Sequence, residues 1–194
     1  MIKLISSKAA RILCKDEKNT DNYELYEYAI YILLSSAFHI ATVIVLGLVF
    51  SLLTESLAFY FSFIAIRKFA GGYHAKTPVR CYVFSVVSTA FILLLLKIIL
   101  IIDLLFIKYG LLLLGLICVI LICLLSPIDT DNNPLNNREK IVYKTISVVA
   151  SITIFLISYV IMFSSLSNIG VSLIFGVLMS ALVLFLGTVL KNRG

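Results

Sequence analysis

The stretch Tyr82–Ile102 reads YVFSVVSTAFILLLLKIILII, and Lys97 is its only charged residue. A helix needs about 20 predominantly apolar residues to cross the hydrocarbon core of a bilayer, which is about 30 Å thick. Runs of similar character cover Ala29–Leu53, Tyr109–Leu125, Ile141–Phe163 and Ile169–Leu190. The sequence therefore predicts an all-α, polytopic integral membrane protein whose helices form a bundle.

The composition supports this fold class. The chain has 194 residues, of which 61% are hydrophobic and 13% charged. A soluble domain has about 45–50% apolar and about 25% charged residues. The net charge of +6 could indicate nucleic-acid binding in a soluble protein, but the Lys and Arg residues lie between the apolar runs, where membrane topology explains them. We therefore expect one membrane domain over residues 1–194 and no nucleic-acid partner.

The segment Ser56–Ile66 is apolar but short for a membrane span. It predicts either a tilted short helix or a re-entrant segment. Counted as a crossing, it gives about six hydrophobic segments and places both termini, the 67–81 segment and the 126–140 loop on one side. Because Lys- and Arg-rich loops stay in the cytoplasm, that side is predicted to be cytoplasmic. Five crossings would put 126–140 on the opposite side from 67–81.

The N-terminal residues 1–20 have apolar side chains at roughly helical spacing, with Lys and Arg between them. This pattern predicts an amphipathic interfacial helix that lies on an anionic membrane surface, so that anionic lipid is an expected partner. The alternative is a solvated tail.

The segment 67–81 reads RKFAGGYHAKTPVRC and contains the most promising reactive pair, His74 and Cys81. A cysteine is nucleophilic as its thiolate, which a nearby histidine or cation favours. On one continuous helix the two residues would lie about 10.5 Å apart along the axis, whereas proton transfer needs about 2.6–3.2 Å. A bend at Pro78 would resolve this, and we expect His74 on a loop and Cys81 near the start of the next helix. The alternatives are an inert or palmitoylated cysteine in an ordinary basic loop.

Other residues are weaker candidates. His39 lies inside the first span, where an ionisable residue is a functional hypothesis, although a hydrogen bond to a neighbouring helix explains it as well. Asp129 and Asp131 begin something like a calcium loop, but Pro134 and Lys140 stand where such a loop needs Gly and Glu. Cys118 and Cys123 are expected only to pack against apolar neighbours. We expect no metal and no cofactor.

The run Arg67–Thr77, followed by Arg80-Cys81, resembles the accessory gene regulator B (AgrB) family of membrane peptidases in Gram-positive quorum sensing. The loop SPIDTDNNPL at 126–135 and the hydrophobic layout extend the resemblance over nearly the whole chain. It implies a cysteine endopeptidase that cleaves an AgrD-type precursor peptide and promotes its cyclisation to a thiolactone or lactone autoinducing peptide. It also implies a homodimer.

The resemblance carries roles to individual residues. His74 falls on the family's catalytic histidine and Cys81 on its catalytic cysteine. Arg67 and Gly72 fall on motif positions associated with activity, and Lys68 and Gly71 stand beside them as supporting or substrate-positioning residues.

Some alternatives stay open from the sequence. A backbone carbonyl or the carboxylates of Asp129, Asp131 or Glu55 could orient His74. The competing functions are a small peptide transporter or exporter without peptidase chemistry, and a structural membrane subunit.

Overall fold

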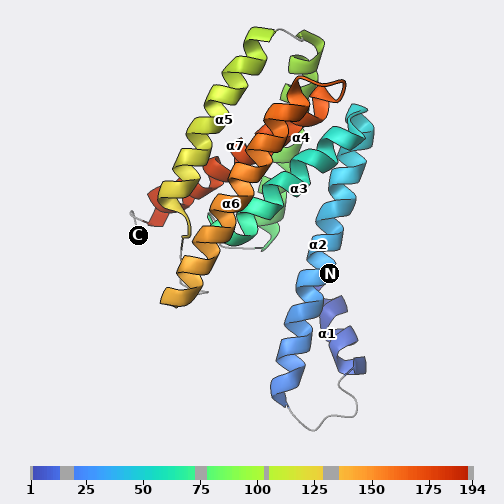
Figure 1. Cartoon of the computed structure of the whole chain (residues 1–194). Coiled ribbons are helices and arrows are strands. Elements are labelled where there is room, and N and C mark those ends of the chain that lie inside the picture. The colour runs from blue at the N-terminus through green and yellow to red at the C-terminus, as the bar shows by residue number, and fades with distance from the viewer. Residues whose placement is uncertain (1, 14–19, 73–77, 103–104, 129–135, 192–194) are drawn as a thin grey trace. The chain divides into compact units, whose positions relative to one another are not determined.

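The computed structural model describes residues 2–13, 20–72, 78–102, 105–128 and 136–191. These residues form helices and contain no strand, which confirms the all-α prediction (Figure 1). The helices are α1 (Ile2–Leu13), α2 (Thr20–Phe50), α3 (Leu53–Ala70), α4 (Pro78–Ile102), α5 (Leu105–Leu125), α6 (Asn137–Met162) and α7 (Ser167–Lys191).

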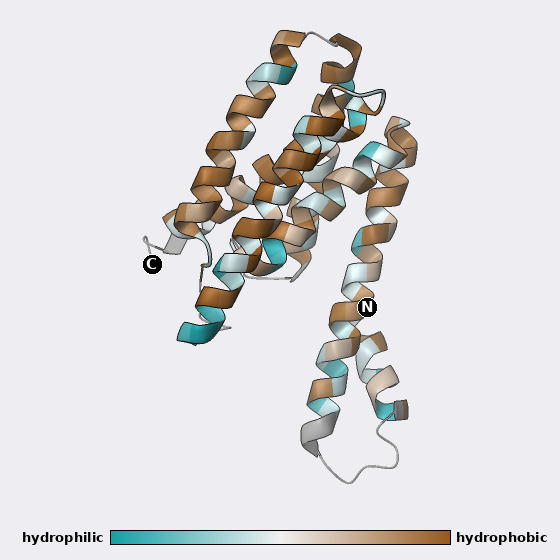
Figure 2. Ribbon diagram, viewed as in Figure 1, coloured by the Kyte–Doolittle hydropathy of each residue, from teal (hydrophilic) through white to brown (hydrophobic). Residues whose placement is uncertain are grey.

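Five of the helices, α2, α4, α5, α6 and α7, are long and apolar enough to cross a membrane. Many of their apolar side chains point outward: the exposed fraction is 86% at Phe106 and 71% at Leu124. Figure 2 shows these hydrophobic surfaces along most of α5, while the first turn of α6 is hydrophilic. Outward-facing apolar helices need lipid as their solvent, so the chain is a multi-pass membrane protein.

The chain divides into two compact units, residues 1–45 and 46–194. In the first unit, the hydroxyl of Tyr23 on α2 donates to the Ser7 carbonyl of α1, 3.4 Å away. Ser6 and Ala10 on α1 are fully buried. The exposed side chains of α1 are both apolar and basic: Leu4, Ile5, Lys8, Arg11 and Ile12. The expected N-terminal helix is therefore present, and it exposes the residue types that an anionic interface would contact.

The second unit is organised around α7, which packs against α3, α5 and α6 and is mostly buried. Ser172, Gly176 and Ser180 recur at four-residue spacing along α7, and all three are buried. A Cβ atom at Gly176 would overlap Ser62 Oγ on α3 and lie 2.9 Å from the Phe59 carbonyl oxygen. Helices in lipid associate through such close backbone approach, because lipid tails remove the hydrophobic drive for helix pairing. The small residues of α7 therefore explain why α3 is its closest neighbour.

The short second segment of the sequence is a continuous helix. At about 1.5 Å per residue, the 18 residues of α3 extend about 27 Å. Near its start, Glu55 Oε1 accepts a hydrogen bond from Asn168 Nδ2 at 3.5 Å. At its end, the Ala70 carbonyl accepts one from the Ile128 N–H at 3.1 Å. Thus α3 runs the full length of the second unit and is not re-entrant.

The second unit has two opposite ends, which are called the Glu55 end and the Cys81 end. The Glu55 end contains Glu55, which is nearly buried and accepts a hydrogen bond from Thr54 Oγ1 at 2.8 Å. At this end Lys97 Nζ donates to the Phe50 carbonyl at 3.3 Å and Lys108 Nζ to Ser167 Oγ at 3.4 Å. The Cys81 end contains the end of α3, the start of α4, the segment 126–128 and the start of α6. Helices α3, α5 and α7 run toward the Cys81 end, and α4 and α6 run away from it (Figure 1).

Helix starts depart from the predicted spans because polar residues extend the helices beyond their apolar portions. The 126–140 loop was predicted one turn too long: α6 begins at Asn137, so Arg138 and Lys140 are helical. The Asn136 N–H donates to Glu139 Oε2 at 2.8 Å, as in a capping box. Capping therefore decides where this helix begins.

Candidate functional site

Arg67 lies in the last turn of α3, at the Cys81 end. Its side chain is half-buried, and its Cζ lies 5.5 Å from the centroid of the Phe63 ring, one turn earlier. A guanidinium over an aromatic face is attracted by the ring quadrupole. The contact therefore holds the Arg67 side chain along α3 beside Phe63.

Gly71 and Gly72 end α3 in a turn that requires glycine. The Gly71 N–H donates to the Arg67 carbonyl at 3.1 Å, and the φ angles are +75° at Gly71 and +129° at Gly72. A Cβ at Gly71 would lie 2.8 Å from the Ile128 carbonyl oxygen, and one at Gly72 would lie 3.0 Å from the Val183 carbonyl oxygen. The backbones that approach this turn are those of the 126–128 segment and α7.

Cys81 is in the first turn of α4, which begins at Pro78. The expected position near a helix start is therefore confirmed. Its side chain is half-buried, and its carbonyl accepts a hydrogen bond from Ser85 Oγ at 3.0 Å. The partial positive charge at a helix N-terminus favours an anionic side chain there. Proline at the first helical position is compatible with this start because it has no N–H to leave unsatisfied.

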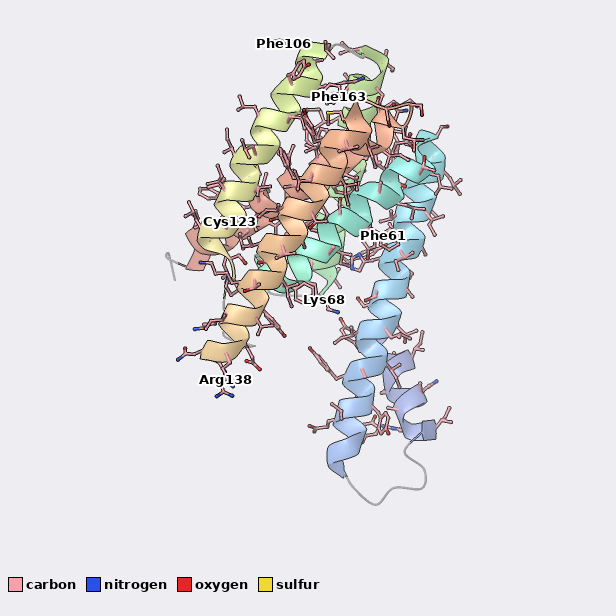
Figure 3. The ribbon with its side chains drawn as sticks, in the orientation of Figure 1. Phe61, Lys68, Phe106, Cys123, Arg138 and Phe163 are labelled. Carbon is pink, nitrogen blue, oxygen red and sulfur yellow. The ribbon has the colours of Figure 1, made fainter. Side chains whose placement is uncertain are left out.

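The fold brings Arg67 and Cys81 together from two different helices. Arg67, in the last turn of α3, and Cys81, in the first turn of α4, lie at the same end of the second unit and within electrostatic range of each other. Lys68, the next residue, is exposed, with Nζ 5.8 Å from the centroid of the Phe69 ring; it is labelled in Figure 3. Of these two adjacent cations, Arg67 is the half-buried one.

The other predicted residues fall into three groups. His74, Asp129 and Asp131 lie outside the described residues. Glu55 lies near the start of α3, about 22 Å along the helix from its last residue, Ala70. His39 lies within α2, as predicted, in the first unit.

Neither of the two described membrane cysteines belongs to the site. Cys118 and Cys123 on α5 are half-buried and pack against an apolar cluster that includes Val119 and Ile122, which confirms the packing role expected for them. Within the described parts of the chain, no group of three or more His, Cys, Asp or Glu residues could hold a metal ion.

Sequence reasoning missed the residues that support the end of α3. Ile128 donates its N–H to Ala70, Val183 abuts Gly72, and Tyr143 on α6 meets Phe69 edge to face at 5.9 Å. Their residue types carry no catalytic signal. The only sequence signal in this region is the high density of turn-forming residues in 126–135. This density predicts a loop, but it does not identify the residues that the loop contacts.

The charge of Arg67 leads to a testable prediction. Arg67→Gln removes a cation at the Cys81 end, so alkylation of Cys81 by the negatively charged reagent iodoacetate should slow by about three- to tenfold, because the cation attracts the anionic reagent. Peptide mass spectrometry of the membrane-embedded protein measures this rate. Lys68→Gln is the matched control and should change the rate by less than about twofold, because exposed charges are screened. Equal slowing in both variants would contradict the assignment.

The chain matches the family described as accessory gene regulator B over residues 6–184. It is 26% identical to an AgrB-like protein of Clostridium perfringens (strain SM101 / Type A) over 193 residues, 93% of this chain and 84% of that protein. It is 29% identical to AgrB-like protein 2 of Clostridium perfringens (strain 13 / Type A) over 147 residues, covering 71% of this chain and 64% of that protein. No solved structure matches the chain significantly.

The family match spans the Arg67 and Cys81 site and most of the membrane helices around it. The chain therefore belongs to the accessory gene regulator B family, a membership that implies a role in the processing of quorum-sensing peptides.

Proposed function

We propose that this protein is a membrane cysteine endopeptidase that cleaves an AgrD-type precursor peptide and promotes its cyclisation. The observation that carries the proposal is the position of Cys81 in the first turn of α4, at the same end of the second unit as Arg67 in the last turn of α3. A cation and a helix N-terminus both favour the thiolate, which is the nucleophilic form of cysteine. We propose Cys81 as the nucleophile and His74 as the residue that transfers the proton, as the resemblance of the segment 67–81 to the family implies.

The first chemical step forms a covalent intermediate. The Cys81 sulfur attacks a carbonyl carbon of the precursor, and the peptide C–N bond breaks. His74 takes the proton of the thiol and delivers it to the leaving amine, which departs as the C-terminal fragment. The product is an acyl-enzyme thioester on Cys81, with the N-terminal part of the precursor still attached.

The second step closes a ring. A thiol or hydroxyl inside the bound precursor attacks the thioester carbonyl, which releases the Cys81 sulfur and leaves a thiolactone or lactone. Exchange between two thioesters is nearly isoenergetic, whereas hydrolysis is strongly downhill. The site must therefore hold the internal nucleophile close and exclude water. We expect a site at the edge of a lipid-embedded bundle to exclude water and to hold the internal nucleophile of the precursor close to the thioester.

The proposed orientation puts the termini and the Cys81 end in the cytoplasm. Arg67, Lys68, Arg80, Arg138 and Lys140 cluster at or near that end in sequence and fold, and basic segments are retained in the cytoplasm. Reaction of introduced single cysteines with a membrane-impermeant thiol reagent in intact cells tests this. Labelling at Asn136→Cys before lysis would contradict the orientation.

Anionic lipid is a proposed partner, supported by the exposed apolar and basic residues of α1. Vesicles with anionic lipid should lower the KM for precursor by about threefold or more relative to neutral vesicles, because they concentrate cationic and amphipathic segments at the surface. High salt should remove most of this difference. A KM indifferent to both lipid charge and salt would contradict this part of the proposal.

A homodimer is likewise proposed from family membership. Native mass spectrometry of the protein released directly from membranes should give twice the mass of one chain. A single-chain mass under conditions that preserve activity would contradict it.

The decisive test uses purified protein in liposomes with a synthetic precursor, followed by mass spectrometry. We expect a released C-terminal fragment, a ring product lighter by one water molecule than the linear acid that hydrolysis would give, and a hydroxylamine-sensitive adduct on Cys81. Cleavage with no adduct on Cys81 would contradict the proposed nucleophile. Uptake of intact precursor into the liposomes without cleavage would favour a transporter instead.

A further inference from the structure

The segment after α5 is fixed to α3 through the backbone. The Ile128 N–H donates to the Ala70 carbonyl at 3.1 Å. The Ile128 carbonyl lies so close to Gly71 that a Cβ there would be 2.8 Å from its oxygen. Ala70 is fully buried, so this backbone pairing is shielded from water. The last turn of α3 therefore ends against Ile128.

The same segment is fixed to α6 through two buried serines. Ser126 and Ser147 are 4% and 0% exposed, and their hydroxyls form a hydrogen bond. Ser147 Oγ also donates to the Lys144 carbonyl at 3.0 Å. Since a serine hydroxyl has a single proton, Ser147 donates to Lys144 and Ser126 donates to Ser147. The chain of hydrogen bonds thus runs from Ser126 into the α6 backbone.

Only Pro127 separates the two attachments, and its ring fixes φ and limits the freedom of the link. One short segment consequently joins α6, through Ser147, to the end of α3, through Ile128. That end of α3 includes the Arg67 carbonyl, which accepts the capping hydrogen bond of Gly71. Movement of the segment would displace Arg67 and the glycine turn together.

We propose that Ser126, Ile128 and Ser147 form a clamp that positions the C-terminal turn of α3 beside Cys81. Ser126 and Ser147 are positioning residues and touch no reacting atom. The kinetic consequence rests on the proposed peptidase function, whereas the clamp itself can be measured without any precursor. A displacement of about 1 Å at a reacting site can cost about 100-fold in rate, so a clamp distant from the chemistry can limit turnover.

Ser147→Ala tests the clamp, and Ser151→Ala is its matched control. Ser151 is one turn further along α6 and equally buried, but its hydroxyl donates to the Val148 carbonyl of its own helix at 2.9 Å. In Ser147→Ala, the Ile128 amide should exchange with deuterium about tenfold faster, because the segment opens more often. In Ser151→Ala, its exchange should match the wild type.

The kinetic arm uses the precursor cleavage assay. Ser147→Ala should lower kcat by about 10- to 100-fold and leave KM within about twofold, whereas Ser151→Ala should leave both near wild type. The double variant Ser126→Ala/Ser147→Ala removes the buried, unpaired hydroxyl. It should recover thermal stability but keep the low kcat, since the link between α6 and the segment is still missing.

Three results would overturn the clamp: unchanged Ile128 exchange in Ser147→Ala, equal loss of kcat in the Ser147 and Ser151 variants, or recovery of kcat in the double variant. A wild type that cleaves no precursor would refute the proposed function instead. In that case faster Ile128 exchange confined to Ser147→Ala would still support the clamp.

Discussion

Replacement of Cys81 by alanine is expected to lower precursor cleavage by on the order of 10⁴-fold or more, to the background rate. The reason is that Cys81 is the proposed nucleophile, and alanine has no side-chain group that can form the acyl intermediate. Precursor binding should persist, because Cys81 is a single half-buried side chain at the start of α4. The measurement is initial-rate cleavage in liposomes, with binding followed separately by fluorescence anisotropy of a labelled precursor.

Cys123→Ala is the matched control, since Cys123 is also half-buried but packs in the core on α5. It should retain cleavage within about threefold of wild type, because small core changes act on stability more than on a remote site. Full cleavage by Cys81→Ala would refute the proposed nucleophile. Loss of cleavage in both variants, with equal loss of folded protein, would show only that the bundle tolerates neither change.

Replacement of Gly176 by alanine is expected to lower the stability of the bundle, although it adds a single methyl group. The added Cβ would overlap Ser62 Oγ, and it would lie 2.8 Å from Ser62 Cβ and 2.9 Å from the Phe59 carbonyl oxygen. Because the backbone of Phe59 cannot rotate away from the added methyl group as the tip of a side chain can, α3 and α7 must move apart. Overpacking of this kind costs about 1–3 kcal/mol, or about 2–12 °C in the melting temperature of a chain this size.

Gly110→Ala provides the comparison, because a Cβ at Gly110 on α5 meets nothing within 4 Å. Alanine is favoured over glycine in a helix by about 1 kcal/mol, so this variant should melt at or above the wild-type temperature. Thermal melting in a mild detergent, followed by circular dichroism, measures both. If Gly176→Ala melted as high as Gly110→Ala, the close approach of α3 and α7 would be wrong.

The sequence predicted the helices whose positions depend on the preference of apolar residues for lipid over water. The apolar runs located α2, α4, α5, α6 and α7 because transfer into lipid depends on composition, which can be read one residue at a time. The position of Cys81 at a helix start followed from Pro78 alone, since proline is accommodated only in the first turn. The apolar runs and the helix start depend only on residues close together in the sequence, so they can be predicted without knowing which distant residues they contact.

What the sequence could not predict depends on partners distant in the chain. The length of α3 was ambiguous because Glu55, Ser62 and Arg67 make it poorly apolar, and its neighbour α7 begins a hundred residues later in the chain. The backbone hydrogen bond from Ile128 to Ala70, beside Gly71, could not be predicted from the sequence. Its donor and acceptor are backbone groups, which do not depend on residue type. The catalytic pairing of His74 with Cys81 remains a prediction, since His74 lies outside the described residues.

The dependence of α3 on α7 has a consequence for the order in which the protein is made. Synthesis from the N-terminus delivers α3, Arg67 and Cys81 to the membrane well before α7, along which α3 packs and whose Val183 abuts Gly72. Until α7 inserts, α3 lacks its closest neighbour, and the glycine turn after α3 lacks its contact with Val183. The reactive end of the molecule is thus completed by α7, so a polypeptide that stops before α7 would contain the nucleophile without the assembled site.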